Sequence, residues 1–258
     1  MTADPPVPAP RHVWNGPYMT WEEACTAAPD RGDAFLSTRW MERIVQQLQE
    51  FRNTFKTKGG ALPPRPCNLP LVCALTHSRS IIDFGGSSGW GYDYLNRALA
   101  NAEISSYVIV EIEHIVEYMK RSSLHSLPVE YKTIEEPMAA CDLLYCNSVL
   151  QYFESNVSFV KLLEKIRPRY ILLDDLVANG VEDFFATQNY YETAIPYRFL
   201  GIEKLLADLG AVGYELLSSE PYASPILGAI HELPMENFPE SFRLRHTLSA
   251  VLRRKAIT

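Results

Sequence analysis

Several features that are missing from the 258-residue sequence narrow the kinds of protein it can encode. No window approaches the roughly 18 uninterrupted apolar residues of a membrane-spanning helix, so we expect no membrane partner. Lysine and arginine number 24 against 31 aspartate and glutamate, which gives a formal net charge of −7. A basic stripe that could neutralise phosphates is therefore missing, and this argues against nucleic acid as a partner.

The cysteine and histidine patterns exclude two further classes of protein. The five cysteines are an odd number and form no Cys-x-x-Cys pair, which predicts reduced thiols and neither a disulfide framework nor a zinc site. The six histidines show no His-x-His or His-x-x-x-His pair, so we expect no metal. The first ten residues lack the basic start and apolar core of a secretory signal, and we therefore expect a cytoplasmic protein.

The residues that are present indicate a globular chain with an N-terminal helical cap. The sequence is 47% hydrophobic and has no internal repeat. Thr20 and Glu23 fit a helix capping box. Before residue 77 we also expect a tail, a turn, a helix and a proline-rich extended connector, at Met1–Pro10, Trp14–Tyr18, Asp33–Phe55 and Leu62–Pro70 respectively. We therefore divide the chain into a tail and cap over 1–76 and a second domain over 77–258.

Short β-rich runs alternate with helical stretches after the cap. The runs are Ser80–Phe84, Tyr107–Glu111, Val129–Lys132, Leu143–Cys146 and Tyr170–Asp174. Apolar residues recur with helical spacing in four stretches, Tyr92–Ala100, His114–Arg121, Val157–Ile166 and Gly201–Leu209. This alternation predicts an α/β, Rossmann-like sheet that is mostly parallel and carries helices on both faces.

Two further strands are expected to close the sheet and bring it to seven. We place them at Tyr214–Ser218 and Ile226–His231, and we expect a terminal amphipathic helix over Phe242–Arg254. Ligands of such sheets bind beyond the carboxyl ends of the strands. Functional residues should therefore follow Phe84, Glu111, Cys146 and Asp174.

A glycine-rich loop after the first of these strands is the strongest local signal. The strand runs into four glycines, Gly85, Gly86, Gly89 and Gly91, and a helix follows. Glycine permits a positive φ and lets the backbone approach a ligand closely, although a tight turn without a ligand is the alternative. The spacing matches neither the dinucleotide fingerprint nor the phosphate-binding Gly-Lys-Ser/Thr loop.

The acid that precedes this loop completes a recognisable pattern. Asp83 stands two positions before Gly85, and Gly89 follows four positions later. This arrangement resembles motif I of the class I S-adenosylmethionine-dependent methyltransferases, whose usual form is acidic-x-Gly-x-Gly-x-Gly. Ser87 stands in place of the middle glycine. The resemblance implies S-adenosylmethionine as the cofactor.

Two later segments support the resemblance. The strand that ends in Glu111 offers a carboxylate that can accept two hydrogen bonds from a ribose diol; Glu113 competes for this role, and a surface acid is the alternative. The segment Cys141–Tyr152 is similar to the fourth-strand region of this superfamily, which implies that Asn147 and Ser148 lie beside the methionine part of the cofactor. The implied cofactor-binding residues are Asp83, Gly85, Gly86, Ser87, Gly89, Glu111, Asn147 and Ser148.

The resemblance extends over most of the chain, from Trp14 to His231. The opening Trp-x-Gly-x-Tyr, the Asp-Phe-Gly-Gly-Ser loop and a late Ile-Pro-Tyr-Arg segment are similar to a poorly characterised group of bacterial methyltransferases. These motifs say little about the methyl acceptor.

Methyl transfer from a sulfonium is an in-line displacement, for which a protein mainly supplies alignment, and a heteroatom acceptor also needs a base. Asp175, which follows Asp174 at the end of the fifth strand, is the leading candidate for this base, with a capping role as its alternative. His114 after the second strand and Tyr152 after the fourth are the other catalytic candidates.

An insert around 180–200 follows the fifth strand and is too long for a simple turn. Long loops of this kind are often lids or binding loops, and this one is rich in aromatic side chains. A structural cover packed on the sheet is the alternative. The expected substrate-binding residues are Tyr18, Gln188, Tyr191, Tyr197 and Arg198.

These features favour a methyltransferase that acts on an O or N atom of a small-molecule metabolite, such as a natural product or a sugar-linked intermediate. Ser87 and the lack of an obvious base motivate an alternative, a non-catalytic binding or scaffold subunit. A nicotinamide enzyme is a third hypothesis, against which the glycine spacing argues. The sequence does not identify the methyl acceptor, and it leaves open whether the protein forms a homodimer.

Overall fold

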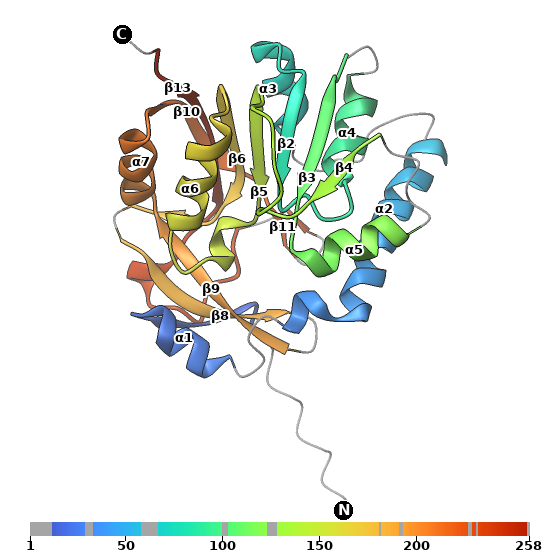
Figure 1. The fold of residues 1–258 in the computed structure, drawn as a ribbon. Helices are drawn as coiled ribbons and strands as arrows, with labels where there is room; N and C mark the ends of the chain where they lie inside the picture. The colour runs from blue at the N-terminus through green and yellow to red at the C-terminus, as the bar shows by residue number, and fades with distance from the viewer. Residues whose placement is uncertain are drawn as a thin grey trace, which may run out of the picture.

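The computed structural model describes residues 12–28, 33–57, 67–99, 103–122, 128–180, 182–190, 193–226, 229–230 and 232–256. Its centre is a seven-stranded sheet with the order β10-β13-β6-β5-β2-β3-β4 (Figure 1). Five strands pair in parallel, namely β2 (Ser80–Phe84), β3 (Ser106–Val110), β4 (Glu130–Lys132), β5 (Leu143–Asn147) and β6 (Tyr170–Leu176). The predicted α/β sheet is confirmed, and its strand order reverses between β2 and β5, where ligands of such sheets bind.

Helices cover both faces of this sheet, as predicted. On one face lie α2 (Thr38–Thr57), α3 (Leu69–Thr76), α4 (Trp90–Ala98) and α5 (Glu113–Arg121). On the other face lie α6 (Val157–Ile166) and α7 (Ile202–Ala211). Because neighbouring residues of a strand point to opposite faces, Ile81 enters the first core and Ile82 the second. Strands that are buried on both faces need the nearly continuous apolar runs that the sequence shows.

The closing strands differ from the prediction. β10 (Tyr214–Tyr222) is a strand as expected, but its partner is β13 (Thr247–Arg254), which runs antiparallel between β10 and β6. The terminal helix predicted over Phe242–Arg254 is therefore wrong. The apolar residues of this segment fit both the helical and the strand period. The segment is a strand because it pairs with β10 on one side and with β6 on the other. In place of the predicted Ile226–His231 strand stand two-residue strands, β11 (Pro225–Ile226) and β12 (Ala229–Ile230).

A second sheet with the order β1-β8-β9-β7 lies below the main sheet in Figure 1. It contains β1 (Trp14–Tyr18), β7 (Ala178–Asn179), β8 (Phe184–Tyr190) and β9 (Thr193–Gly201). The predicted turn at Trp14–Tyr18 is thus a strand, and the insert around 180–200 is mainly a β-hairpin rather than a loop. Trp14, Phe184 and Phe199 form the centre of its apolar core. The hairpin explains why a segment of this length follows β6.

The N-terminal helices follow the local signals in the sequence. α1 (Trp21–Ala27) begins at the predicted capping box, in which Glu23 N–H donates to Thr20 Oγ1 at 3.2 Å and Thr20 N–H donates to the Glu23 carboxylate at 3.1 Å. The predicted Asp33–Phe55 helix divides into η1 (Asp33–Leu36) and α2. Most of the predicted Leu62–Pro70 connector lies outside the described residues, and its last two residues are helical, because α3 begins at Leu69 and tolerates proline in its first turn.

No helix in the described part of the chain has both the length and the apolar character needed to cross a membrane. The tail predicted at Met1–Pro10 lies outside the described residues.

Candidate functional site

The glycine loop between β2 and α4 is built from left-handed backbone. Gly85, Ser87 and Gly89 have φ angles of 74°, 52° and 80°. A Cβ at Gly85 would overlap the side chain of Val149, and one at Gly86 would lie 2.5 Å from the Asp83 carboxyl group. Glycine is therefore required at both positions. Ser87 adopts the conformation that a glycine would take, so its presence does not change the path of the loop.

Left-handed residues other than glycine gather at the same edge of the sheet. Ser87 follows β2, Ser148 follows β5 and Asp175 lies near the end of β6. Their φ angles are 52°, 58° and 53°. The other two such residues among those described, His77 and Arg167, end helices α3 and α6, where this conformation is common. Strained backbone costs about 1–3 kcal/mol per residue and concentrates at functional sites. The carboxyl edge of the sheet is therefore the candidate site.

Asp83 supports the loop from below. Its side chain is 2% exposed and accepts a hydrogen bond of 2.6 Å from the Tyr107 hydroxyl on β3. Burial raises the pKa of Asp83 to about 7, against the opposing effect of the Tyr107 hydrogen bond. Gly86 packs directly on this carboxyl group. Asp83 is thus part of the floor under the loop rather than a group that reaches into solvent.

Glu111 connects the end of β3 to the glycine loop. Its carboxylate accepts hydrogen bonds from the backbone N–H of Ser87 at 3.0 Å and of Ile112 at 3.2 Å. Burial raises the pKa of Glu111 to about 7, although both backbone donors oppose that shift. Next to it the apolar side chain of Ile112 is 46% exposed. A carboxylate beside an exposed apolar side chain can bind a sugar diol and a flat ring at once.

The ends of β5 and β6 are joined by hydrogen bonds. Ser148 N–H donates to the backbone oxygen of Asp174 at 3.1 Å, and Asn147 Nδ2 donates to the Tyr145 hydroxyl at 2.9 Å. The Ser148 hydroxyl accepts from Gln151 Nε2 at 2.7 Å. Asn147 and Ser148 therefore lie side by side at the edge, next to the glycine loop that follows the adjacent strand β2.

The second sheet reaches this edge through Tyr152, which belongs to η2 (Leu150–Tyr152) after β5. The Tyr152 hydroxyl donates to Gln188 Oε1 on β8 at 3.1 Å, and its ring contacts Phe35 and Tyr197 with centroid separations of 5.2 and 5.6 Å. Burial raises the pKa of Tyr197, and the charges of Tyr152 and Asp175 raise it further. Four predicted residues, Tyr152, Asp175, Gln188 and Tyr197, are thus brought together.

No protein-family model and no curated protein matches this sequence. Solved structures, in contrast, are similar to this chain. Human N-acetylserotonin methyltransferase in complex with S-adenosylmethionine has a TM-score of 0.50 and 13% identity, over 93% of this chain and 63% of that one. The chain has the fold of the class I S-adenosylmethionine-dependent methyltransferases.

Two other similar structures have lower TM-scores. A methyltransferase of Listeria monocytogenes gives 0.46 and 14% identity, over 69% of this chain and 92% of that one. An O-methyltransferase from neocarzinostatin biosynthesis gives 0.48 and 12% identity, over 92% of this chain and 62% of that one.

Within this methyltransferase fold, two predicted residues lie away from the cluster around Tyr152. Arg198 is 0% exposed and pairs with Asp183 at 3.0 Å. Arg198 is next to Tyr197 on β9, so the two side chains point to opposite faces of the second sheet. Arg198 lies on the same face as its β8 partner Phe185, whose ring contacts Trp21 of α1. Arg198 therefore has its charge partner within the protein.

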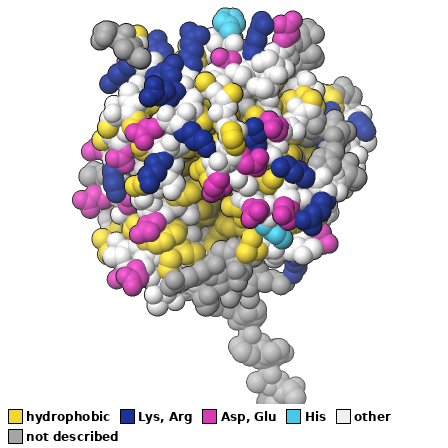
Figure 2. Space-filling model, in the orientation of Figure 1, with side chains coloured by type: hydrophobic (Ala, Val, Ile, Leu, Met, Phe, Trp, Pro, Cys, Tyr) yellow, Lys and Arg dark blue, Asp and Glu magenta, His cyan; other side chains and the backbone are white. Residues whose placement is uncertain are grey.

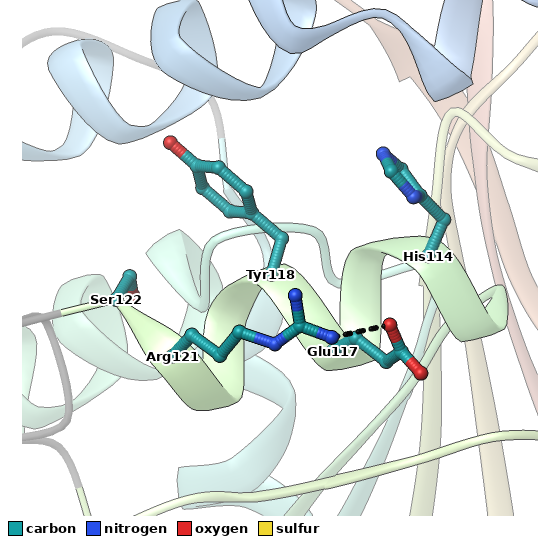
Figure 3. Close-up of a pocket in the computed structure, with 5 residues that line it drawn as sticks. All are labelled: His114, Glu117, Tyr118, Arg121 and Ser122. Atoms are coloured by element: carbon teal, nitrogen blue, oxygen red, sulfur yellow. Dashed lines mark hydrogen bonds and ion pairs between the residues drawn. The ribbon is translucent and has the colours of Figure 1, made fainter.

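His114 lies in the first turn of α5 and lines a separate pocket of about 370 Å³. Figure 3 shows His114 and Tyr118 pointing to the same side of α5, with the ion pair of Arg121 and Glu117, 2.7 Å long, beside them. Ser122 completes the described lining of this pocket.

Tyr18 is half-buried and faces Phe185 across the β1–β8 pair, while Tyr191 lies outside the described residues. Figure 2 shows hydrophobic side chains gathered low in the middle of the face drawn, with acidic side chains above them. The residues described contain no cluster of histidine, cysteine, aspartate and glutamate that could hold a metal ion.

Sequence reasoning missed two residues at this edge, Asn68 and Ser249. Asn68 donates through its backbone N–H and its side chain to the carboxylate of Asp174, at 3.0 and 3.2 Å, and Ser249 donates to the same carboxylate at 2.6 Å. Asp174 is 1% exposed, and both of its oxygens accept hydrogen bonds. No local signal could find these contacts, which join residues 106 and 75 positions apart.

Proposed function

We propose that this protein is an S-adenosylmethionine-dependent methyltransferase that methylates an O or N atom of a small-molecule acceptor. The observation that carries this proposal is the position of the Glu111 carboxylate, 3.0 Å from the backbone nitrogen of Ser87 in a left-handed glycine loop. It joins the two motifs that the sequence places 24 residues apart. The fold, and the S-adenosylmethionine held by the human enzyme that shares it, support the same cofactor.

The residues at the edge fit each part of this cofactor. Glu111 would accept hydrogen bonds from the ribose hydroxyls, and the exposed Ile112 side chain would contact the adenine ring. The loop from Gly85 to Gly89 would pass beneath the sulfonium. Asn147 and Ser148 would lie beside the amino-acid part. When bound, the cofactor supplies a methyl group that is already activated for transfer.

The acceptor would bind between the carboxyl edge and the second sheet. Tyr152 and Gln188 form a polar pair there, with the ring of Phe35 beside them. We assign the proton-accepting role to Asp175, because its charge acts on Tyr197 beside this pair, whereas Asp174 is 1% exposed. A natural product or a sugar-linked compound would suit an aromatic site of this kind.

A non-catalytic subunit is the alternative function. Two features motivate it, Ser87 in place of a glycine and the lack of an obvious base. Because Ser87 adopts the left-handed conformation that the motif requires, this residue no longer distinguishes a degenerate loop from a working one.

Titration of the purified protein with S-adenosylhomocysteine tests the proposal. We expect Glu111→Ala to weaken binding by about 1–3 kcal/mol, because charge-assisted hydrogen bonds to the ribose are lost. Glu113→Ala is the matched control, since this acid lies two residues away in the first turn of α5, and its affinity should equal that of the wild type. A wild-type protein that binds no ligand at millimolar concentration would contradict the proposal.

A further inference from the structure

The side chain of Asn68 has an unusual role at the start of α3. Asparagine at this position normally caps a helix by accepting a hydrogen bond from its first turn. Here the Asn68 side chain makes no capping hydrogen bond. Its amide nitrogen instead donates to Asp174 Oδ1 at 3.2 Å and to Ser249 Oγ at 2.9 Å. The polar contacts of this side chain therefore go to the sheet rather than to α3.

The partners of Asn68 fix which end of its amide faces outward. Both groups next to the nitrogen are acceptors or can act as acceptors, and a reversed amide would bring its oxygen against the Asp174 carboxylate. The amide oxygen accepts no hydrogen bond within the described part of the chain, and the residue is half-buried. Asn68 thus presents one oriented acceptor, with a buried carboxylate directly behind it.

The amide oxygen of Asn68 lies at the carboxyl edge of the main sheet, on the side away from Glu111. Cys67, the preceding residue, has its sulfur 3.8 Å from the Tyr145 hydroxyl of β5, and that hydroxyl accepts from Asn147. From β3, whose end Glu111 follows, to β6, whose Asp174 holds the Asn68 amide, is three strand intervals, about 14 Å. A nucleoside held by its ribose at Glu111 can span this distance with an amino-acid tail.

We propose that Asn68 binds the α-ammonium group of the cofactor through its amide oxygen, with Asp174 and Ser249 as positioning residues. The assignment rests on the proposed function. An ammonium group is a donor without acceptors, so it matches an amide oxygen. The adjacent carboxylate adds negative charge where the ligand is positive. Asp174 makes no direct hydrogen bond to the ammonium group, because both of its oxygens already accept hydrogen bonds from Asn68 and Ser249.

Two nucleosides separate this role from a structural one. S-adenosylhomocysteine carries the amino-acid tail, whereas 5′-methylthioadenosine has the same nucleoside and sulfur without it. We expect Asn68→Ala to weaken S-adenosylhomocysteine binding by about tenfold or more, as for a hydrogen bond to a charged group, and to change methylthioadenosine binding less than twofold. Ser249→Ala, which leaves Asn68 less firmly held, should give a smaller loss with the same selectivity.

Asn156 provides the matched control. It stands at the same position before α6, makes no side-chain cap and donates to an aspartate, Asp208, at 2.8 Å. Asn156→Ala should leave both affinities unchanged. Equal weakening of both nucleosides by Asn68→Ala, or no weakening of either, would overturn the assignment while leaving the proposed function in place. A wild-type protein that binds neither nucleoside would overturn the proposed function and this assignment with it.

Discussion

At the scale of single residues, the site depends on a few side chains in unusual surroundings. Ser87, Ser148 and Asp175 hold left-handed backbone at neighbouring strand ends, and Glu111 carries a carboxylate whose pKa burial raises to about 7. Neither state is favourable for the isolated residue. Strained backbone and shifted pKa values concentrate at functional sites, so their position at one edge supports this edge as the candidate site.

Replacement of Ser87 by glycine tests the cost of this strain. We expect Ser87→Gly to raise the free energy of unfolding by about 0.5–1 kcal/mol, because the cost of left-handed backbone exceeds the entropy that glycine loses on folding. Chemical denaturation measures the change. Ser88→Gly is the control at a buried neighbour without a positive φ, and it should lower the stability. A destabilised Ser87→Gly protein would show that the serine side chain itself supports the loop.

The raised pKa of Glu111 predicts opposite effects of pH on ligand affinity and on stability. Ribose hydroxyls donate to the ionised form, so S-adenosylhomocysteine should bind more weakly at pH 6 than at pH 8. A carboxyl group whose pKa rises on folding stabilises the protein below its unfolded pKa of 4.5, and this stability is lost as the pH rises through about 7. Glu111→Gln should reduce both dependences. If affinity and stability depend on pH equally in the variant and the wild type, the assignment of Glu111 as the ribose-binding carboxylate is contradicted.

At the scale of secondary-structure elements, the cap helix α2 is attached to α4 by a buried charge. Asp93 on α4 accepts from Arg52 of α2 at 2.9 Å and from Arg97 at 3.4 Å. The Arg97 guanidinium also lies 4.2 Å from the ring centroid of Phe55 on α2. This arrangement fixes the far end of α2 relative to the helix that follows the glycine loop.

Removal of this charge tests how α2 is held. We expect Asp93→Ala to lower the free energy of unfolding by about 2–3 kcal/mol, because two arginines that are mostly buried lose their partner. The matched control is Glu117→Ala, which breaks the exposed pair with Arg121 and should cost less than about 1 kcal/mol. Thermal and urea unfolding of the three proteins measure the difference. A loss at Asp93 no larger than at Glu117 would show that packing alone holds α2.

The elements that could be predicted are those whose signals are local. The parallel strands, the capping box at Thr20 and the helix Val157–Ile166 each follow from a short pattern, and so do the glycine loop and Glu111. β13 could not be predicted, because its apolar residues fit two periods and its two neighbours in the sheet decide between them. The contacts of Asn68 with Asp174 and Ser249 were equally hidden, since they join distant parts of the chain.

At the scale of the whole molecule, two sheets meet at one edge. The main sheet contributes Glu111, the glycine loop, Asn147 and Ser148, while the second sheet contributes Gln188 and Tyr197 through its contacts with Tyr152. Figure 1 shows β8 and β9 below the main sheet. Under the proposed function, this arrangement would give a nucleoside-binding edge and a separate aromatic surface for the acceptor.

A crystal structure of the protein with S-adenosylhomocysteine tests the central claim most directly. We predict that the ribose hydroxyls lie within hydrogen-bonding distance of the Glu111 carboxylate and that the tail runs over Gly85–Gly89 toward Asn147. A nucleoside bound elsewhere on the protein, or bound in the reverse direction with its amino group at Glu111, would contradict this account.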